Sequence, residues 1–147
     1  MGRRLEAHSV GSNDTAPVSS FVDTNVLVRH LTGDPPEMAS RATDFLRRED
    51  ELLIVDLVVA ETVYVLESFY EASRRDVADA IRSLLAMESV VVVDAPLLFK
   101  ALEVYENDRV DFAEAYLVAC AETTGILTVA SFDRSIDQVT TVDRIEP

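Results

Sequence analysis

Short apolar runs alternate along this chain with longer amphipathic segments, and the pattern predicts strands separated by helices. The expected strands are residues 19–24, 51–56, 89–94 and 126–131, with a further short edge strand near the C-terminus. These runs are apolar without the alternation of a half-exposed strand. They therefore predict a parallel sheet covered by helices on both faces, an α/β fold.

The segments between the strands carry helix signals. Proline opens the helix at 35–50, which has Met38, Ala42, Phe45 and Leu46 on one face, and Gly33 and Gly125 follow two other expected helices. The expected helices are 25–32, 35–50, 57–70, 73–88, 95–108 and 111–125.

The chain has 147 residues, 48% of them hydrophobic, which is enough for one domain with a substantial core. Residues 1–17 lack apolar periodicity and are expected to form a flexible N-terminal extension, followed by a single domain at 18–147. The apolar runs are too short to cross a bilayer and no signal peptide is recognised, so a cytoplasmic protein is expected. The single Cys120 excludes an internal disulfide and is expected to be a buried helix residue.

The charge balance is strongly acidic, with 27 Asp and Glu residues against 13 Lys and Arg residues and a net charge of −14. Charge alone argues against a nucleic-acid partner, because non-specific affinity comes mainly from basic groups that displace counterions from phosphates. Bound divalent metal would offset that charge only locally.

Several acidic residues lie where open parallel sheets place their ligands, at the carboxyl ends of strands. Asp23 ends the first expected strand and Asp133 follows the fourth. Asp111 and Glu114 are three residues apart at the start of the last expected helix. Glu61 is within a helix whose neighbouring turns are apolar, and a charged group on such a face is rarely buried without a partner.

Each acidic residue also has a structural interpretation. Asp23 would serve as a helix cap, Asp111 and Glu114 match a capping box, and Asp133 fits an ordinary loop. If these carboxylates converge, each like-charge pair at about 4 Å costs on the order of 4 kcal/mol at an effective dielectric of 20. Such a cluster would need bound cations.

The available ligands define the metal. Only two histidines, His8 and His30, are present, so a zinc site built on imidazole and thiolate is excluded. Carboxylates with Asn25 and water suit Mg²⁺ or Mn²⁺. The reaction that such a site performs most naturally is hydrolysis of a phosphate ester by metal-activated water.

Four motifs in this order and spacing, "FVDTNVLVRHL", "VVAETVYVL", "VDFAEAYLVACAETTG" and "LTVASFD", resemble the PIN domain, and most closely the VapC-type toxin ribonucleases of bacterial toxin–antitoxin pairs. The resemblance runs from about Val18 to the C-terminus. It implies a three-layer α/β/α fold with a central parallel sheet and a Mg²⁺- or Mn²⁺-dependent endoribonuclease. It also implies an RNA substrate, a homodimer and a cognate VapB-like antitoxin.

The resemblance also assigns roles to the acidic residues. Asp23, Glu61 and Asp133 match the first, second and fourth acidic positions of the family. Glu114 stands at the third, where the family usually has aspartate, and Asp111 one turn earlier shares the ligand role. Asp23, Asp111, Glu114 and Asp133 are the expected metal ligands, with Glu61 and Asp133 holding a second ion or orienting water.

Other residues near the motifs are candidates for contact with RNA. Asn25 and Ser131 match polar positions of the family, and Arg134 follows Asp133 directly. Arg29 and Arg109 also lie near the motifs, although a solvated surface explains every one of these arginines equally well.

Two other classes of function remain open. One keeps the fold without toxicity, as a housekeeping PIN nuclease in RNA processing or a degenerate PIN domain that only binds RNA. The other is a receiver-like Mg²⁺-binding signalling domain with Asp56 as phosphoacceptor. That class requires two adjacent acids after the first strand and a lysine after a late strand, whereas Lys100 falls inside an expected helix.

Overall fold

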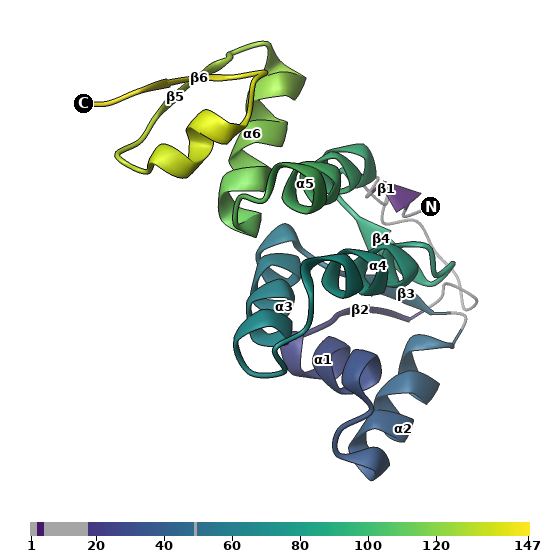
Figure 1. Cartoon of the computed structure of the whole chain (residues 1–147). Coiled ribbons are helices and arrows are strands. Elements are labelled where there is room, and N and C mark those ends of the chain that lie inside the picture. Colours follow the sequence, from purple (N-terminus) through teal and green to yellow (C-terminus); the bar gives the residue numbers. More distant parts are fainter. Residues whose placement is uncertain (1–2, 5–17, 49) are drawn as a thin grey trace, which may run out of the picture.

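A parallel four-stranded sheet forms the centre of the molecule (Figure 1). The computed structural model describes residues 3–4, 18–48 and 50–147, the first two as backbone only. The strands are β1 (Arg3–Arg4), β2 (Ser19–Phe21), β3 (Glu51–Leu53) and β4 (Val90–Val92), in the order β1-β4-β3-β2. Helices connect β2, β3 and β4, so the predicted three-layer α/β/α class is confirmed.

All six predicted helices are present, each with bounds close to those expected. They are α1 (Thr24–Thr32), α2 (Pro36–Leu46), α3 (Asp56–Ser68), α4 (Arg74–Leu85), α5 (Ala95–Asp108) and α6 (Phe112–Thr124). Gly33 and Gly125 end α1 and α6 with φ of 71° and 76°, a left-handed conformation that glycine adopts without steric cost.

The core is formed where the apolar strands meet the helices. Val90, Val91 and Val92 are all buried, as expected for a strand covered on both faces. Tyr105 of α5 is fully buried, and its hydroxyl group donates a hydrogen bond to the Glu67 carboxylate.

Some predicted details of burial were wrong. Met38 is 44% exposed, so the buried face of α2 is formed by Ala39, Ala42 and Leu46. Cys120 is half-buried on α6 rather than fully buried. Among the described residues, no helix has the length and apolar character to cross a membrane.

The predicted N-terminal extension is described only in part. Arg3 and Arg4 pair in parallel with Val91 and Val92 and so form the edge strand β1. The rest of residues 1–17 lies outside the described residues.

The last two strands form a sheet of their own. β5 (Thr128–Ala130) pairs in parallel with β6 (Asp143–Ile145), and the 3-10 helix η1 (Arg134–Gln138) connects them. Figure 1 shows this pair beside α6 and away from the four-stranded sheet. The expectation that the strand at 126–131 belongs to the central sheet was therefore wrong for the single chain.

These strands pack with α6 into a small unit, residues 111–147, called the C-terminal unit below; it includes Asp111, the N-cap of α6. Val129, Ile136, Val139 and Val142 are buried in it. Arg144 donates from Nε to Asp137 Oδ1 at 2.9 Å and from Nη1 to the Ser131 carbonyl oxygen at 2.9 Å. The unit is therefore held together by its own apolar contacts and ion pair.

The first half of α6 fixes the C-terminal unit to the rest of the chain. Phe112 is buried and lies edge-to-face against Tyr105, with ring centroids 6.1 Å apart. The Tyr116 hydroxyl group donates to Asp56 Oδ2 at the start of α3. Asp56 Oδ1 is buried and has no hydrogen-bond partner among the described residues. The bond from Tyr116 is therefore important for keeping this carboxylate paired.

Removal of the Tyr116 hydroxyl group is expected to destabilise the fold. In Tyr116→Phe, Asp56 Oδ2 would lose the hydrogen bond from Tyr116, and the free energy of unfolding should fall by about 1–3 kcal/mol in a urea titration. Tyr64→Phe on α3 is the control, because Tyr64 is 70% exposed and its hydroxyl group should contribute little. Equal stability of the two variants would show that the Tyr116 contact does not hold α6.

Candidate metal centre

Asp23 and Glu61 come together at the carboxyl end of β2. Asp23 caps α1, because its Oδ1 accepts a hydrogen bond from the Thr24 amide at 2.8 Å. The Thr24 hydroxyl group donates to Glu61 Oε2 at 2.6 Å and so links the two acidic residues. The structural interpretation of Asp23 as a cap is confirmed, and a capping carboxylate still offers its second oxygen to a ligand.

These residues line an open cavity of about 530 Å³. The cavity is also lined by Asn25, Arg29 and Asp34, and by Phe69 and Tyr70 directly after the end of α3. Arg29 Nη1 donates to the Asp34 carbonyl oxygen at 3.2 Å, and the Tyr70 hydroxyl group donates to Asp34 Oδ2 at 3.0 Å. The cavity therefore combines carboxylates, an amide and one guanidinium group.

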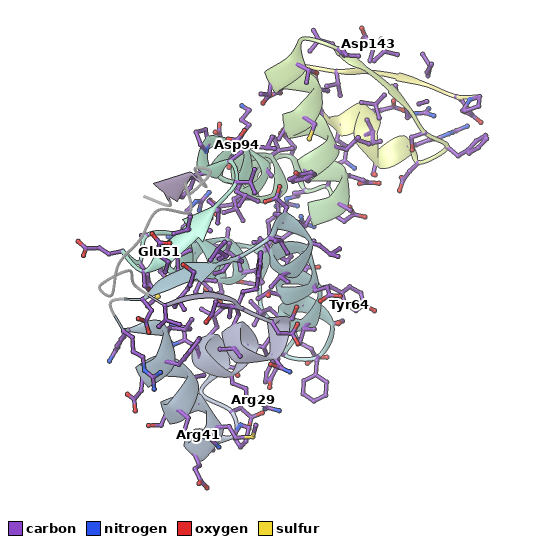
Figure 2. All side chains as sticks on the ribbon, turned by 180° about the vertical axis from the view of Figure 1, so that it is seen from behind. Arg29, Arg41, Glu51, Tyr64, Asp94 and Asp143 are labelled. Carbon is purple, nitrogen blue, oxygen red and sulfur yellow. The ribbon has the colours of Figure 1, made fainter. Side chains whose placement is uncertain are left out.

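The expected burial of Glu61 was wrong. Glu61 is exposed, and its apolar neighbours Leu57 and Tyr64 are 71% and 70% exposed. Figure 2, seen from behind, shows Tyr64 projecting from the surface. Glu61 consequently shares an apolar face of α3 that is uncovered in the single chain.

A second acidic group lies in the C-terminal unit. Asp111 caps α6 by accepting from the Glu114 amide at 2.8 Å, which confirms its predicted capping role. Glu114 Oε2 accepts from the Ser135 hydroxyl group at 2.7 Å, and Asp133 Oδ1 accepts from the Ser135 amide at 2.9 Å. Ser131 Oγ accepts from the Asp133 amide at 3.0 Å and fixes the turn after β5.

The pKa values of Glu114 and Asp133 move in opposite directions. Partial burial raises the pKa of Glu114, and the adjacent Asp133 and Asp111 carboxylates add to the increase. The Ser135 amide lowers the pKa of Asp133, and a hydrogen bond with Glu114 lowers it further. Opposite shifts of this kind are expected for two carboxylates that lie close together.

The two acidic groups are separate in the single chain. Asp23 follows β2 and Glu61 lies on α3, whereas Asp111, Glu114 and Asp133 belong to the C-terminal unit (Figure 1). Within residues 18–48 and 50–147, no group of three or more His, Cys, Asp or Glu side chains could hold a metal ion. The donor types fit Mg²⁺ or Mn²⁺, but a single copy of the chain does not assemble them into one cluster.

The candidate arginines differ in position. Arg29 faces the cavity beside Asp23, whereas Arg109 and Arg134 are exposed. Arg109 ends α5 with φ of 55°, and Arg134 begins η1 directly after Asp133.

Ser135, Asp34 and Tyr70 were missed in the sequence. Ser135 contacts Asp133 and Glu114. The only local signal for it is the turn in which Asp133 binds the amide two residues later. Asp34 and Tyr70 meet through a contact that spans 36 residues, for which the sequence gives no signal.

Asp56 has the wrong environment for a phosphoacceptor. Its Oδ2 accepts a hydrogen bond from the Tyr116 hydroxyl group, and its Oδ1 is buried. The receiver-like interpretation therefore has no support at this residue.

Comparisons with known proteins agree with the fold and with the motifs. The family model described as PIN domain matches residues 20–142. The chain is 27% identical over 117 residues to a protein named VapC ribonuclease from Aquifex aeolicus (strain VF5), covering 78% of this chain and 87% of that protein.

Proposed function

Because this chain belongs to the PIN domain family, we propose that it is an endoribonuclease that uses Mg²⁺ or Mn²⁺ to hydrolyse RNA phosphodiester bonds. The observation that carries the proposal is the pairing of Asp23 and Glu61 through Thr24 at the carboxyl end of β2. These residues face an open cavity together with Asn25 and Arg29. The similarity to a protein named VapC ribonuclease supports the same activity.

Each acidic residue has a role in this proposal. Asp23, Glu114 and Asp111 would hold a first ion, while Glu61 and Asp133 would hold a second ion or orient water. When bound, the metal would supply positive charge that activates water and stabilises the leaving oxygen. Asn25, Ser131 and Arg134 contact the RNA.

The cation is an oxygen-bound one. The acidic residues, Asn25 and Ser131 offer only hard oxygen donors, which suit Mg²⁺ and Mn²⁺. The His30 ring contacts a hydroxyl group rather than a carboxylate, since its Nδ1 lies 2.8 Å from Thr43 Oγ1 between α1 and α2.

A basic groove beside the site offers a path for the RNA backbone. A second cavity of about 550 Å³ runs between α1 and α2 and shares Asn25 and Arg29 with the first. Arg41 and Arg48 also line it, and Figure 2 shows Arg29 and Arg41 at the same end of the molecule. Local arginines in this groove would attract phosphates even though the chain carries a net charge of −14.

Arg41→Ala is expected to weaken RNA binding without affecting the metal. If Arg41 contacts a phosphate, the slope of log Kd against log salt concentration should fall by about one, measured with the Asp23→Asn background to prevent cleavage. Arg75→Ala on α4 removes the same charge from an exposed position outside the groove. An equal change of slope in both variants would contradict a specific groove.

The metal and the reaction are tested by mapping RNA fragments. The purified chain would be incubated with total tRNA in Mg²⁺, in Mn²⁺ and in EDTA, with metal added back to the EDTA sample. Discrete fragments with 5′-phosphate and 3′-hydroxyl ends that require metal are the expected result. Fragments with 2′,3′-cyclic phosphate ends, or equal cleavage in EDTA, would overturn the proposal, because those ends require attack by the RNA's own 2′-hydroxyl group.

The biological role proposed is that of a toxin in a VapBC-type pair, acting on RNA in the cytoplasm as a homodimer until a cognate antitoxin binds. The support is the name of the relative, VapC ribonuclease. Induced expression of the wild-type chain should arrest bacterial growth, while Asp23→Asn should not. Normal growth with an active enzyme would favour a housekeeping RNA-processing nuclease.

A further inference from the structure

Each of the two sheets in the described structure has two outer edges, and those of β2 and β5 lie next to the acidic residues. β2 is the last strand of the four-stranded sheet and pairs only with β3, and β5 pairs only with β6. Exposed edges of this kind are templates for pairing with another chain. Both edges here belong to parallel sheets and are three residues long.

The backbone groups that face these edges can be identified. The Val22 amide donates to the Leu53 carbonyl oxygen at 3.0 Å, so the backbone groups of Ser20 and Val22 face β3. Those of Ser19 and Phe21 therefore face the open side. The Ser131 amide donates to the Ile145 carbonyl oxygen at 3.0 Å. By the same alternation, Thr128 and Ala130 face the open side of β5.

Apolar side chains accompany both edges. Phe21 on β2 is 73% exposed, and Leu57 on α3 is 71% exposed. In the C-terminal unit, Ile126 and Phe132 flank β5 and are 69% and 72% exposed. Large apolar side chains that gather in this way on a soluble domain indicate an interface.

We propose that β5 of one copy of this chain pairs in parallel with β2 of a second copy, reciprocally, so that the two copies complete each other's acidic site. Each site then contains Asp23 and Glu61 of one copy with Asp111, Glu114 and Asp133 of the other. The proposed strand pairing depends only on the open strand edges, whereas the catalytic role of the joined site rests on the proposed function.

Parallel pairing is the arrangement that joins the acids. Asp23 lies two residues after β2 and Asp133 lies three residues after β5, so both follow the carboxyl ends of their strands. Parallel neighbours bring those ends to one edge of the sheet. In the joined sheet the strand order would be β4-β3-β2-β5-β6. The order along the chain then runs backwards up to β2 and forwards from β5, and ligands bind at such a switch point in parallel sheets.

The partner is a second copy because α6 holds the C-terminal unit away from its own β2. α6 is fixed to its own chain by the buried Phe112 and by the contact of Tyr116 with Asp56. β5 is fixed to α6 in turn, through buried Val129 and the contact of Ser135 with Glu114. Closure onto its own β2 would require one of these packed contacts to break, whereas exchange between copies leaves both in place.

Cross-linking between single-cysteine chains tests the exchange without any need for nuclease activity. In a Cys120→Ala background, chains carrying Ser19→Cys and Thr128→Cys would be co-expressed and treated with a flexible bismaleimide that bridges strands about 5 Å apart in either register. A cross-linked pair of chains is expected, with a solution mass twice the 16.3 kDa of the chain. Ser83→Cys, exposed on α4, replaces Ser19→Cys in the control mixture and should give no product.

The opposite results would overturn the exchange. A monomeric mass with cross-linking only inside a chain that carries both cysteines would show that β5 closes onto its own β2. A monomeric mass with no cross-link in either sample would show that the edges stay unpaired.

Complementation then tests the joined site. Differently tagged Asp23→Asn and Asp133→Asn chains would be co-expressed and the mixed dimer isolated. With exchange, one of its two sites receives only native residues, so about half of the wild-type activity per dimer should return. A mixed dimer as inactive as either parent, in the presence of active wild-type enzyme, would mean that each site belongs to one chain. Inactive wild-type enzyme with intact cross-linking would instead contradict the proposed function alone.

Discussion

Asp23→Asn is expected to reduce metal-dependent RNA cleavage by more than about 100-fold. Loss of residues that merely support metal ligands costs 10- to 100-fold, and a direct ligand should cost more. Asparagine is as good a helix cap as aspartate, so α1 should keep the bond from the Thr24 amide. The substitution therefore removes charge from the site while it leaves the fold intact.

Asp34→Asn is the matched control for this variant. Asp34 lines the same cavity, but it lies in the loop after α1 rather than at the end of a strand. Its neutralisation should change the cleavage rate little. Equal losses in the two variants would point to a general effect of charge, and cleavage that survives in Asp23→Asn would indicate another active residue or a contaminating nuclease.

Arg74→Ala is expected to lower the free energy of unfolding by about 3–5 kcal/mol, because charged hydrogen bonds contribute about 1.5–3 kcal/mol each and cation–π contacts somewhat less. Arg74 Nη1 donates to the Tyr105 carbonyl oxygen at 2.9 Å and also to that of Val110. The guanidinium carbon lies 4.4 Å from the centre of the Tyr105 ring. These contacts join α4 to α5 and to the segment between α5 and α6.

Arg75→Ala separates the loss of these contacts from the loss of a positive charge. Arg75 is the next residue on α4 and is exposed. Its replacement should change stability by only a few tenths of a kcal/mol. Thermal or urea unfolding of both variants checks the comparison, and similar midpoints would show that the Arg74 contacts contribute little.

The order of strands and helices could be predicted because local signals agree with it. Four apolar strand runs, the glycine that ends α1 and the glycine that ends α6 fall where the structure has them. Proline near the start of α2 is another such signal. Strand bounds were longer in the prediction because apolar residues continue past the last ladder hydrogen bond, as Val93 does after β4.

Strand pairing and surface exposure could not be read from the sequence. An apolar run such as 126–131 shows that a strand will be buried, but not which neighbour it pairs with, since that depends on where α6 directs the chain. Glu61 shows the same limit: its apolar neighbours Leu57 and Tyr64 suggested burial, yet they form an uncovered face. In the proposed exchange between copies, a partner would cover this face of α3.

The sequence identified each candidate acidic residue separately, but which of them meet depends on tertiary structure. Asp23 and Glu61 are 38 positions apart in sequence and meet through Thr24, and Glu114 and Asp133 meet through Ser135. The position of each acidic residue along the chain was enough to make it a candidate. The separation of the two groups followed only from the position of the C-terminal unit.

Calorimetric titration with Mn²⁺ tests most directly whether these two acidic groups act as one metal site. Wild-type chain, Asp23→Asn and Asp133→Asn would be titrated under the same conditions, with Asp34→Asn as control. The expected result is binding by the wild type and the control, and a loss of at least about tenfold in affinity in each of the other two variants. Unchanged Mn²⁺ affinity in either Asp23→Asn or Asp133→Asn would contradict a shared metal site.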